Sequence, residues 1–311
     1  MSVFSLARRD YLPLILAAAC WGFGTVVSKR AVAEIPPLAL LPIQLGSSLL
    51  FLGILVCVRG LPFRDPTASP ILGRLGVLNP GLAYALSLLG LVTITASLSV
   101  MLWALEPLLI LGLAAWFLRE RVTPGLVILS LVAVGGMLLV IYQPGDAGSP
   151  IGVLLTVAGV GCCAVYTVIT RRWISTSDST AQVVVAQQAY ALAFAFLVVT
   201  AAWILGGAVL PVAVSPIGLA SATGSGVLYY GLAYWLYLTG LRQVPASIAV
   251  ASFYLIPVFG VAGGLLFLGE RLVPSQWLGV AVVLGAIAVI LGRTSGAEPA
   301  IVPRQQAVRP Q

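Results

Sequence analysis

Glu106 is the residue of this sequence whose position most directly suggests chemistry. It is the one acidic residue deep inside an apolar stretch, about eleven residues from one end of that stretch and twelve from the other. An ionisable group at that depth in hydrocarbon is costly unless it is paired or faces water. Two interpretations stay open. Glu106 couples protons or orients a polar group of a substrate, or it is a protonated or hydrogen-bonded glutamate that fixes helix packing.

Prolines form a second pattern around this position. Pro107 follows Glu106 directly, and Pro257 occupies the corresponding place 150 residues later. A proline inside a helix removes a backbone hydrogen bond and frees a carbonyl, which is tolerated where neighbours or cavity water satisfy that group. The pairing favours two hinges or cavity walls over chance. Asn79 and Pro80 interrupt an earlier apolar stretch in the same way and add a polar group.

Aromatic residues gather near these prolines, away from the ends of the apolar stretches, where membrane aromatics usually lie. An interior tyrosine needs a partner for its hydroxyl, so the pattern favours a polar cavity, although each ring taken singly could serve packing alone. Gln187 and Gln188 are candidates for further polar walls. We expect a substrate pocket lined by Trp103, Tyr254, Tyr84, Tyr234, Phe253, Tyr230, Trp21 and Gln44.

The elements that must position these residues are membrane-spanning helices. Of the 311 residues, 60% are apolar and 8% are charged, whereas an ordinary soluble domain has about 25% charged residues. Apolar runs of about 20 residues, long enough to cross a hydrocarbon core of about 30 Å, recur along the chain. The pattern predicts an all-α polytopic membrane protein with spans near 11–32, 38–58, 71–92, 95–118, 124–142, 151–171, 182–206, 216–240, 247–268 and 274–292.

Residue types exclude several classes of function. The net charge of +7 comes from 16 basic residues that are scattered over loops, so no nucleic-acid partner is expected. Histidine is absent, which rules out an imidazole metal site or a histidine base. The four cysteines lie in apolar stretches, where free cysteine behaves as a small hydrophobe. No glycine-rich nucleotide loop occurs, so we expect no cofactor and no ATP-driven pumping by this chain.

Placing both termini inside sorts the basic residues by side. Thirteen of the 16 then lie inside, and only Lys29, Arg30 and Arg271 lie outside, each with Glu34 or Glu270 nearby in the sequence. This distribution follows the positive-inside rule. It predicts a multi-pass protein of the bacterial cell inner membrane with cytoplasmic N- and C-termini.

The sequence also repeats itself at an offset of 150 residues. "GLAYALSLLGL" at 81–91 matches "GLAYWLYLTGL" at 231–241, and 20 of the 60 positions from 81 to 140 are identical to their counterparts. The repeat predicts two five-helix halves, 1–145 and 146–295, followed by a disordered cytoplasmic tail at 296–311. Because five is odd, the halves are inverted in the membrane, which supplies two conformations of similar energy around a midplane site.

Two copies of the pattern P-x9-F-L-x-E-R-x2-P, from Pro107 to Pro124 and from Pro257 to Pro274, close the fourth helix of each half. This pattern resembles the EamA repeat of the drug/metabolite transporter (DMT) superfamily, over nearly the whole chain. Among ten-helix members, the chain is most similar to exporters of amino acids and related metabolites, including the YddG-type exporters of aromatic amino acids. The resemblance implies the fold strongly and the substrate weakly.

Together these patterns favour a secondary exporter of small metabolites, aromatic or neutral amino acids first, working by alternating access around a midplane cavity. Its expected partners are the small-molecule substrate and the lipid bilayer, with protons as a candidate coupling ion. A drug or nucleoside exporter of the same fold is the alternative, and a passive channel or a membrane-embedded enzyme is a weaker one. Glu120 and Glu270 lie at helix ends, where a structural clamp is favoured over a substrate site.

Overall fold

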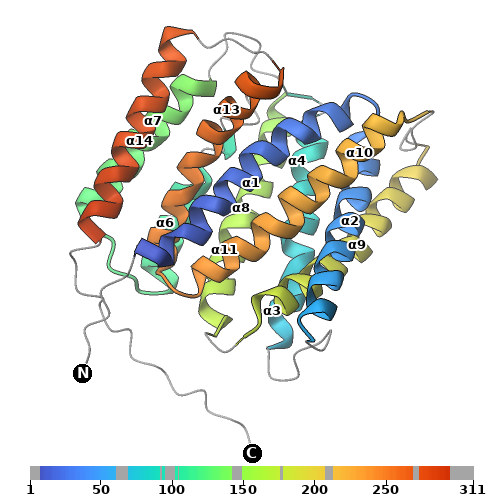
Figure 1. The fold of residues 1–311 in the computed structure, drawn as a ribbon, viewed down its shortest axis with the longest axis horizontal. Coiled ribbons are helices and arrows are strands. Elements are labelled where there is room, and N and C mark those ends of the chain that lie inside the picture. The colour runs from blue at the N-terminus through green and yellow to red at the C-terminus, as the bar shows by residue number, and fades with distance from the viewer. Residues whose placement is uncertain are drawn as a thin grey trace, which may run out of the picture.

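The computed structural model describes residues 8–60, 69–91, 93–94, 102–103, 105–141, 149–175, 178–206, 213–268 and 273–294. Within these ranges all regular elements are helices, no strand occurs, and the helices form ten spans, as the sequence predicts (Figure 1). The expected tail at 296–311 and the expected clamp residue Glu270 lie outside the described residues.

The predicted and observed spans differ by only a few residues at their described ends. The first half consists of α1 (Arg8–Val32), α2 (Pro37–Val58), a third span made of α3 (Pro70–Gly76), η1 (Val77–Leu82) and α4 (Ala83–Leu91), then α6 (Glu106–Phe117) and α7 (Pro124–Ile141). The second half consists of α8 (Pro150–Trp173), α9 (Thr180–Ile204), an eighth span made of α10 (Pro216–Ser225), η2 (Gly226–Leu232) and α11 (Ala233–Leu241), a ninth made of α12 (Ala246–Ala249), η3 (Val250–Leu255) and α13 (Ile256–Leu268), and α14 (Pro274–Thr294).

Proline sets many of the helix starts. It is the first residue of α2, α3, α7, α8, α10 and α14, a position where its missing N–H is not needed and its fixed φ suits the helix. Serine precedes three of these prolines. The hydroxyl oxygens of Ser149 and Ser215 accept hydrogen bonds from the backbone N–H groups of Ile151 at 3.3 Å and Gly218 at 2.9 Å, which caps α8 and α10.

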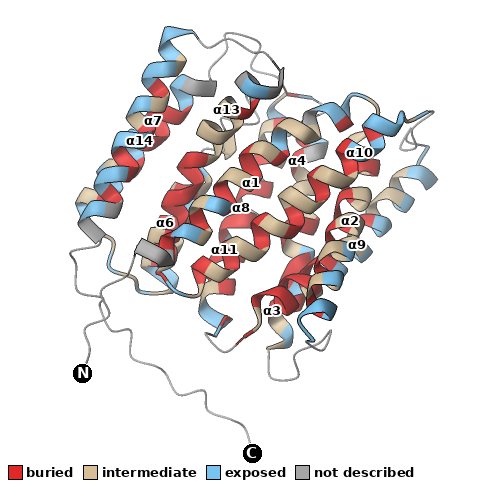
Figure 2. Ribbon diagram, viewed as in Figure 1, coloured by how far each residue is buried: buried red, intermediate tan, exposed pale blue. Residues whose placement is uncertain are grey.

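The outer surfaces of the helices are apolar. Four single helices, Tyr11–Val32, Pro37–Val58, Pro150–Trp173 and Thr180–Ile204, are each long and apolar enough to cross a bilayer. Figure 2 shows buried residues concentrated along the central helices α1, α8 and α11. Large apolar side chains such as Trp116, Leu154 and Leu197 are exposed, which suits contact with lipid. The chain is therefore a multi-pass membrane protein.

The two halves pack into one another through contacts that repeat. Helix α1 packs on α11 and α13 of the second half, and its counterpart α8 packs on α4 and α6 of the first. Helix α2 packs on α9, and α7 packs on α14, so that equivalent spans also pair (Figure 1). These contacts obey the two-fold relation that an inverted duplication creates, and they place α1, α4, α6, α8, η2 and α11 around the interior.

The third and eighth spans are broken at the same repeat position. Asn79 has a non-helical backbone conformation, with φ −147° and ψ 122°, inside η1. The counterpart segment η2, at Gly226–Leu232, has π-helical hydrogen bonding. Irregular backbone at membrane depth is tolerated where it is surrounded by protein or lines a cavity, so the two breaks mark the interior face of these spans.

Candidate functional site

Trp21 of α1 lies in the middle of an aromatic cluster built by both halves. Its ring centroid is 5.6 Å from that of Tyr234, 5.4 Å from Tyr237 and 5.3 Å from Phe253, all in tilted or edge-on arrangements, which aromatic pairs prefer. The buried indole N–H of Trp21 has no hydrogen-bond partner among the described residues. It is a donor that a ligand could use, since buried polar groups are normally paired.

A second group of rings adjoins the first at Tyr229, whose centroid is 6.5 Å from that of Trp21. Tyr84 of α4 stacks on Trp103 at 5.5 Å, with an interplanar angle of 28°. It also meets Tyr229 and Tyr230 edge-on, at 5.8 Å and 5.4 Å. Tyr84, Trp103 and Tyr229 remain partly accessible, whereas Tyr230 is buried.

Hydroxyl groups in this cluster bond across the two halves. The Tyr84 hydroxyl donates to the Tyr229 hydroxyl at 2.9 Å. The Tyr234 hydroxyl donates to Oδ1 of Asn79 at 3.0 Å, at the break in the third span. The interior is therefore an apolar cluster with paired polar groups, not a uniform apolar core.

Glutamine side chains form the polar edge of the cluster. Gln44 of α2 donates through Nε2 to the hydroxyl oxygens of Ser28 at 3.0 Å and Ser225 at 2.9 Å. Gln188 of α9 donates through Nε2 to the backbone carbonyl of Tyr230 at 2.8 Å, at the break in the eighth span. Its Oε1 atom is buried without a partner among the described residues, so it remains available as an acceptor.

Glu106 begins α6 and faces this interior. It shares a helix face with Ile110 and Ala114, which are buried in the core that also contains Trp21 and Tyr234. The neighbouring position Leu105, in contrast, is exposed on the outer surface. The rotation of α6 therefore turns the acidic side chain toward the aromatic cluster and away from lipid.

Among the described residues, none places a fixed cation beside Glu106. Its carboxyl group is near enough to Cys163 of α8 and to Tyr229 and Tyr237 of the eighth span to act on them electrostatically. Neither an ion pair nor a hydrogen bond joins this carboxyl group to another residue in the described part of the chain. A carboxylate at this depth needs such a partner. Glu106 can therefore pair with a cationic group of a ligand, or bind a proton and become neutral.

Residues from both halves of the cluster lie near the middle of their spans. Trp21 is central in α1, Asn79 in the third span, Cys163 in α8 and Tyr229 in the eighth span. Inverted-repeat transporters bind substrate near the bilayer midplane, where discontinuous helices meet. The cluster occupies that place in this fold.

Tyr254 does not join the cluster that contains Phe253. It is fully buried in a second core with residues of α7 and α14, among them Val134 and Ile287. Pro107 and Pro257 are each the second residue of an α-helix, α6 and α13. A six-residue 3-10 segment, Val250–Leu255, directly precedes α13, so the helix changes form where Pro257 stands.

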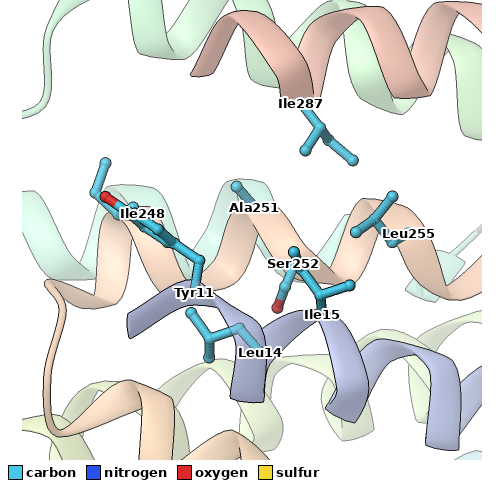
Figure 3. Close-up of a pocket in the computed structure, with 8 residues that line it drawn as sticks. All are labelled: Tyr11, Leu14, Ile15, Ile248, Ala251, Ser252, Leu255 and Ile287. Carbon is cyan, nitrogen blue, oxygen red and sulfur yellow. The ribbon is translucent and has the colours of Figure 1, made fainter. Parts of the chain in front are cut away.

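Two of the cavities among the described residues lie away from the cluster. Figure 3 shows one of about 10 Å³ between α1, η3 and α14, lined by Tyr11, Leu14, Ile15, Ile248, Ala251, Ser252, Leu255 and Ile287. It is at the lower limit of volume that holds one water molecule. A wider, open groove of about 440 Å³ runs between α2, α9 and α10 past Pro42, Gly46 and Phe196. Neither cavity includes the aromatic cluster.

Carboxylates tie the two halves together at both ends of the molecule. The two carboxylate oxygens of Glu120 accept hydrogen bonds from the backbone N–H groups of Ala246 and Ser247, each at 2.9 Å, as the predicted clamp requires. Glu34 accepts from the backbone N–H of Ser215 at 2.7 Å and from its hydroxyl at 2.9 Å. These bonds hold the pKa of Glu34, which lies in the α1–α2 loop, below its usual value.

Sequence reasoning missed three residues of the cluster, Tyr166, Tyr229 and Tyr237. The Tyr166 hydroxyl donates to Oε1 of Gln187 at 2.9 Å. The repeat offers a signal for Tyr229, because an offset of 150 residues places it over Asn79. Tyr166 and Tyr237 carry no such signal, since the helices that contain them are apolar on every side.

Known proteins with similar sequences point to transport. The model of the EamA-like transporter family matches residues 10–142 and again 150–292. The "Uncharacterized transporter YwfM" of Bacillus subtilis is 29% identical over 58% of this chain, and the match spans 60% of that protein's length. An "Uncharacterized transporter" of Archaeoglobus fulgidus is 25% identical over 91% of this chain and 99% of its own.

The fold has a solved counterpart. A crystal structure superposes with a TM-score of 0.75 over 91% of this chain and 98% of its own, at 19% sequence identity. At that identity the likeness concerns the fold alone. The duplicated family match and this superposition agree with the ten-span architecture and with the repeat seen in the sequence.

Proposed function

Because the chain belongs to the EamA-like transporter family, we propose that it is a secondary transporter that exports small metabolites, with neutral and aromatic amino acids as the leading substrates. The mid-span cluster of rings and hydroxyls that both halves build around Trp21 carries this proposal. Broad apolar walls with a few placed polar groups are typical of small-molecule sites. The ring of an aromatic substrate can replace one side-chain ring in the ring-to-ring contacts that these side chains make with one another.

Transport proceeds by alternating access between the halves. The Glu120 contact with Ser247 closes one end of the interface, and the Glu34 contact with Ser215 closes the other. Opening toward one side breaks the contact at that end and keeps the one at the opposite end. Pro107 and Pro257 are the proposed hinges, because each is the second residue of an α-helix that begins inside its span, after a turn at Leu105 and after the 3-10 segment Val250–Leu255.

The charge distribution supports a bacterial inner-membrane location with the termini in the cytoplasm and the halves, 1–145 and 146–295, inversely oriented. Arg59 then faces the cytoplasm and Leu205 faces the outside. In a variant without native cysteines, a cysteine at Arg59 should react with a membrane-impermeant maleimide only in inside-out vesicles. A cysteine at Leu205 should react only in intact cells, and the reverse pattern would contradict this orientation.

Counterflow in proteoliposomes tests the transport mechanism. Vesicles loaded with unlabelled substrate and diluted into labelled substrate should accumulate label transiently above equilibrium, because a carrier exchanges the two. A passive channel gives simple equilibration. A panel of amino acids, nucleosides and lipophilic drugs in the same assay separates the leading substrate class from the alternative exporters of this fold.

A further inference from the structure

One part of the interior combines partly accessible aromatic rings with a partly accessible carboxyl group. Tyr84, Trp103, Tyr229 and Glu106 all remain partly accessible, whereas most of the rings around them are buried. We call these four residues the acidic aromatic site. Tyr84 contacts both of the other rings, at 5.5 Å and 5.8 Å, so the three aromatic side chains form one continuous wall.

Glu106 lies on the same side of its span as this wall. The backbone N–H of Leu105 donates to the carbonyl of Leu102 at 3.1 Å, and that of Leu109 donates to the carbonyl of Leu105 at 3.0 Å. The first bond closes a turn that leads into α6, and the second belongs to the first turn of α6. Residues three apart on a helix are neighbours, so this spacing favours a position of Glu106 on the same side of the span as Trp103, and Glu106 lies in the vicinity of Tyr229.

In the part of the chain that the structure describes, no cationic side chain stands opposite the acid. Every lysine and arginine of the sequence lies at a helix end or outside the described helices. A guanidinium or ammonium group is the strongest protein partner for a substrate carboxylate. Recognition of a substrate cation calls for a carboxylate and electron-rich ring faces, which attract ammonium groups. The site has the second set of groups and lacks the first.

The other half offers no second copy of this chemistry. At an offset of 150 residues, Phe253 stands over Trp103 and Ile256 stands over Glu106. The ring is kept and the acid is lost. Of these two repeat-related positions, the one in the first half offers a partner for a positive charge and the one in the second half does not.

We propose that the acidic aromatic site binds the ammonium group of an organic amine, through the carboxylate of Glu106 and the rings of Trp103, Tyr84 and Tyr229, and leaves a substrate carboxylate unrecognised. The inference rests on the proposed function and deepens it by naming the substrate class. Amino acids bind through their ammonium end, and the corresponding decarboxylated amines bind more tightly, because no carboxylate is then buried without a partner.

The test uses three probes that share one ring: phenethylamine, phenylalanine and 3-phenylpropionate. Binding to the purified chain in lipid nanodiscs is measured by titration calorimetry. We expect phenethylamine to bind at least ten-fold more tightly than phenylalanine, and 3-phenylpropionate not to bind. Equal or tighter binding of phenylalanine, or binding of 3-phenylpropionate, would overturn the proposal.

Two variants locate the site. Glu106→Gln keeps the shape of the side chain and should weaken phenethylamine binding at least ten-fold. Asp178→Asn, which changes an acid on the α8–α9 loop, should leave binding unchanged. Trp103→Leu removes a ring face without removing a charge and should weaken binding several-fold, which keeps the test available if the glutamine variant does not fold. Wild-type affinity in Glu106→Gln or in Trp103→Leu would contradict the assignment.

Counterflow of the same probes distinguishes a failure of the proposed amine site from a failure of the proposed transport function. If phenylalanine exchanges at the wild-type rate in Glu106→Gln, the acidic aromatic site is wrong while the proposed transport stands. If the wild-type chain binds phenethylamine but no probe and no member of the metabolite panel shows counterflow, the proposed transport is wrong.

Discussion

The hydroxyl of Tyr84 donates to the hydroxyl of Tyr229 at 2.9 Å, and the duplicated fold contains this contact twice. An offset of 150 residues places Tyr234 over Tyr84 and Tyr229 over Asn79, and Tyr234 donates to Asn79 at 3.0 Å. Each tyrosine thus bonds to the broken segment of the opposite half. The pair marks where the two halves meet at the middle of the membrane.

These two bonds should differ in strength. Tyr234→Phe leaves the buried Oδ1 of Asn79 without its donor. Tyr84→Phe likewise removes the donor to the Tyr229 hydroxyl, but Tyr229 is partly accessible. We expect the free energy of unfolding to fall by about 1–3 kcal/mol for Tyr234→Phe, the usual cost of an unsatisfied buried acceptor, and by less for Tyr84→Phe. Thermal unfolding in detergent measures both, with the exposed Tyr190→Phe as control. An equal effect of all three would contradict a role for the paired bonds.

Two adjacent glycines test the contact between α7 and α14. A Cβ atom at Gly136 would meet the carbonyl oxygen of Gly279 at 3.0 Å and Cγ2 of Val283 at 2.9 Å, whereas one at Gly135 would meet nothing within 4 Å. Gly136→Ala should therefore destabilise the protein by about 1–3 kcal/mol through overpacking. Gly135→Ala should leave stability unchanged or raise it, since alanine favours the helix. Stability in detergent decides, and the opposite order would contradict this packing.

Glu120 should act as a clamp and not as a substrate ligand. Glu120→Ala removes both hydrogen bonds to the start of α12 and should lower the free energy of unfolding by about 0.5–2 kcal/mol, the usual cost of losing a helix cap. Glu120→Gln retains one acceptor oxygen and should cost less. In a Ser247→Cys background, maleimide labelling should be faster in the alanine variant. Unchanged labelling together with lost substrate binding would instead make Glu120 a binding residue.

Acid should weaken the clamp at the opposite end. Hydrogen bonds from Ser215 lower the pKa of Glu34 below its ordinary value of 4.5, with Arg30 a smaller cause in the same direction. A lowered pKa means that the stabilisation is complete above pH 4.5 and is lost as the pH falls through the lower pKa of the folded protein. Thermal stability of the wild type should therefore decline more steeply below pH 4.5 than that of Glu34→Gln. Parallel curves would show that this contact contributes nothing.

The fold was largely predictable because its signals are local. Apolar length and the repeat each act within one span or relate spans by a fixed offset, and the observed helices begin within a few residues of the predicted spans. The break at Asn79 was visible for the same reason. The interlocking of the two halves follows from their equivalence once the repeat is recognised.

The side-chain site was less predictable because helix rotation was not encoded locally. Phe253 and Tyr254 both looked like pocket walls, yet consecutive residues in a 3-10 segment such as Val250–Leu255 point about 120° apart. Phe253 faces Trp21, and Tyr254 faces α7 and α14. In a soluble helix a polar face fixes the rotation, but these spans are apolar on all sides, so only the packed structure distinguishes the two residues.

The central claim, that the halves alternately open at their two ends, is tested most directly by locking one end. Cysteines at Glu34 and Ser215, whose side chains are in contact at 2.9 Å, are joined with a short bifunctional thiol reagent in a variant that lacks the native cysteines, and counterflow is measured before cross-linking, after it and after cleavage of the reagent. The account predicts that exchange stops in the cross-linked protein, returns on cleavage, and is unaffected by the reagent in either single-cysteine variant. Undiminished counterflow through fully cross-linked protein would contradict it.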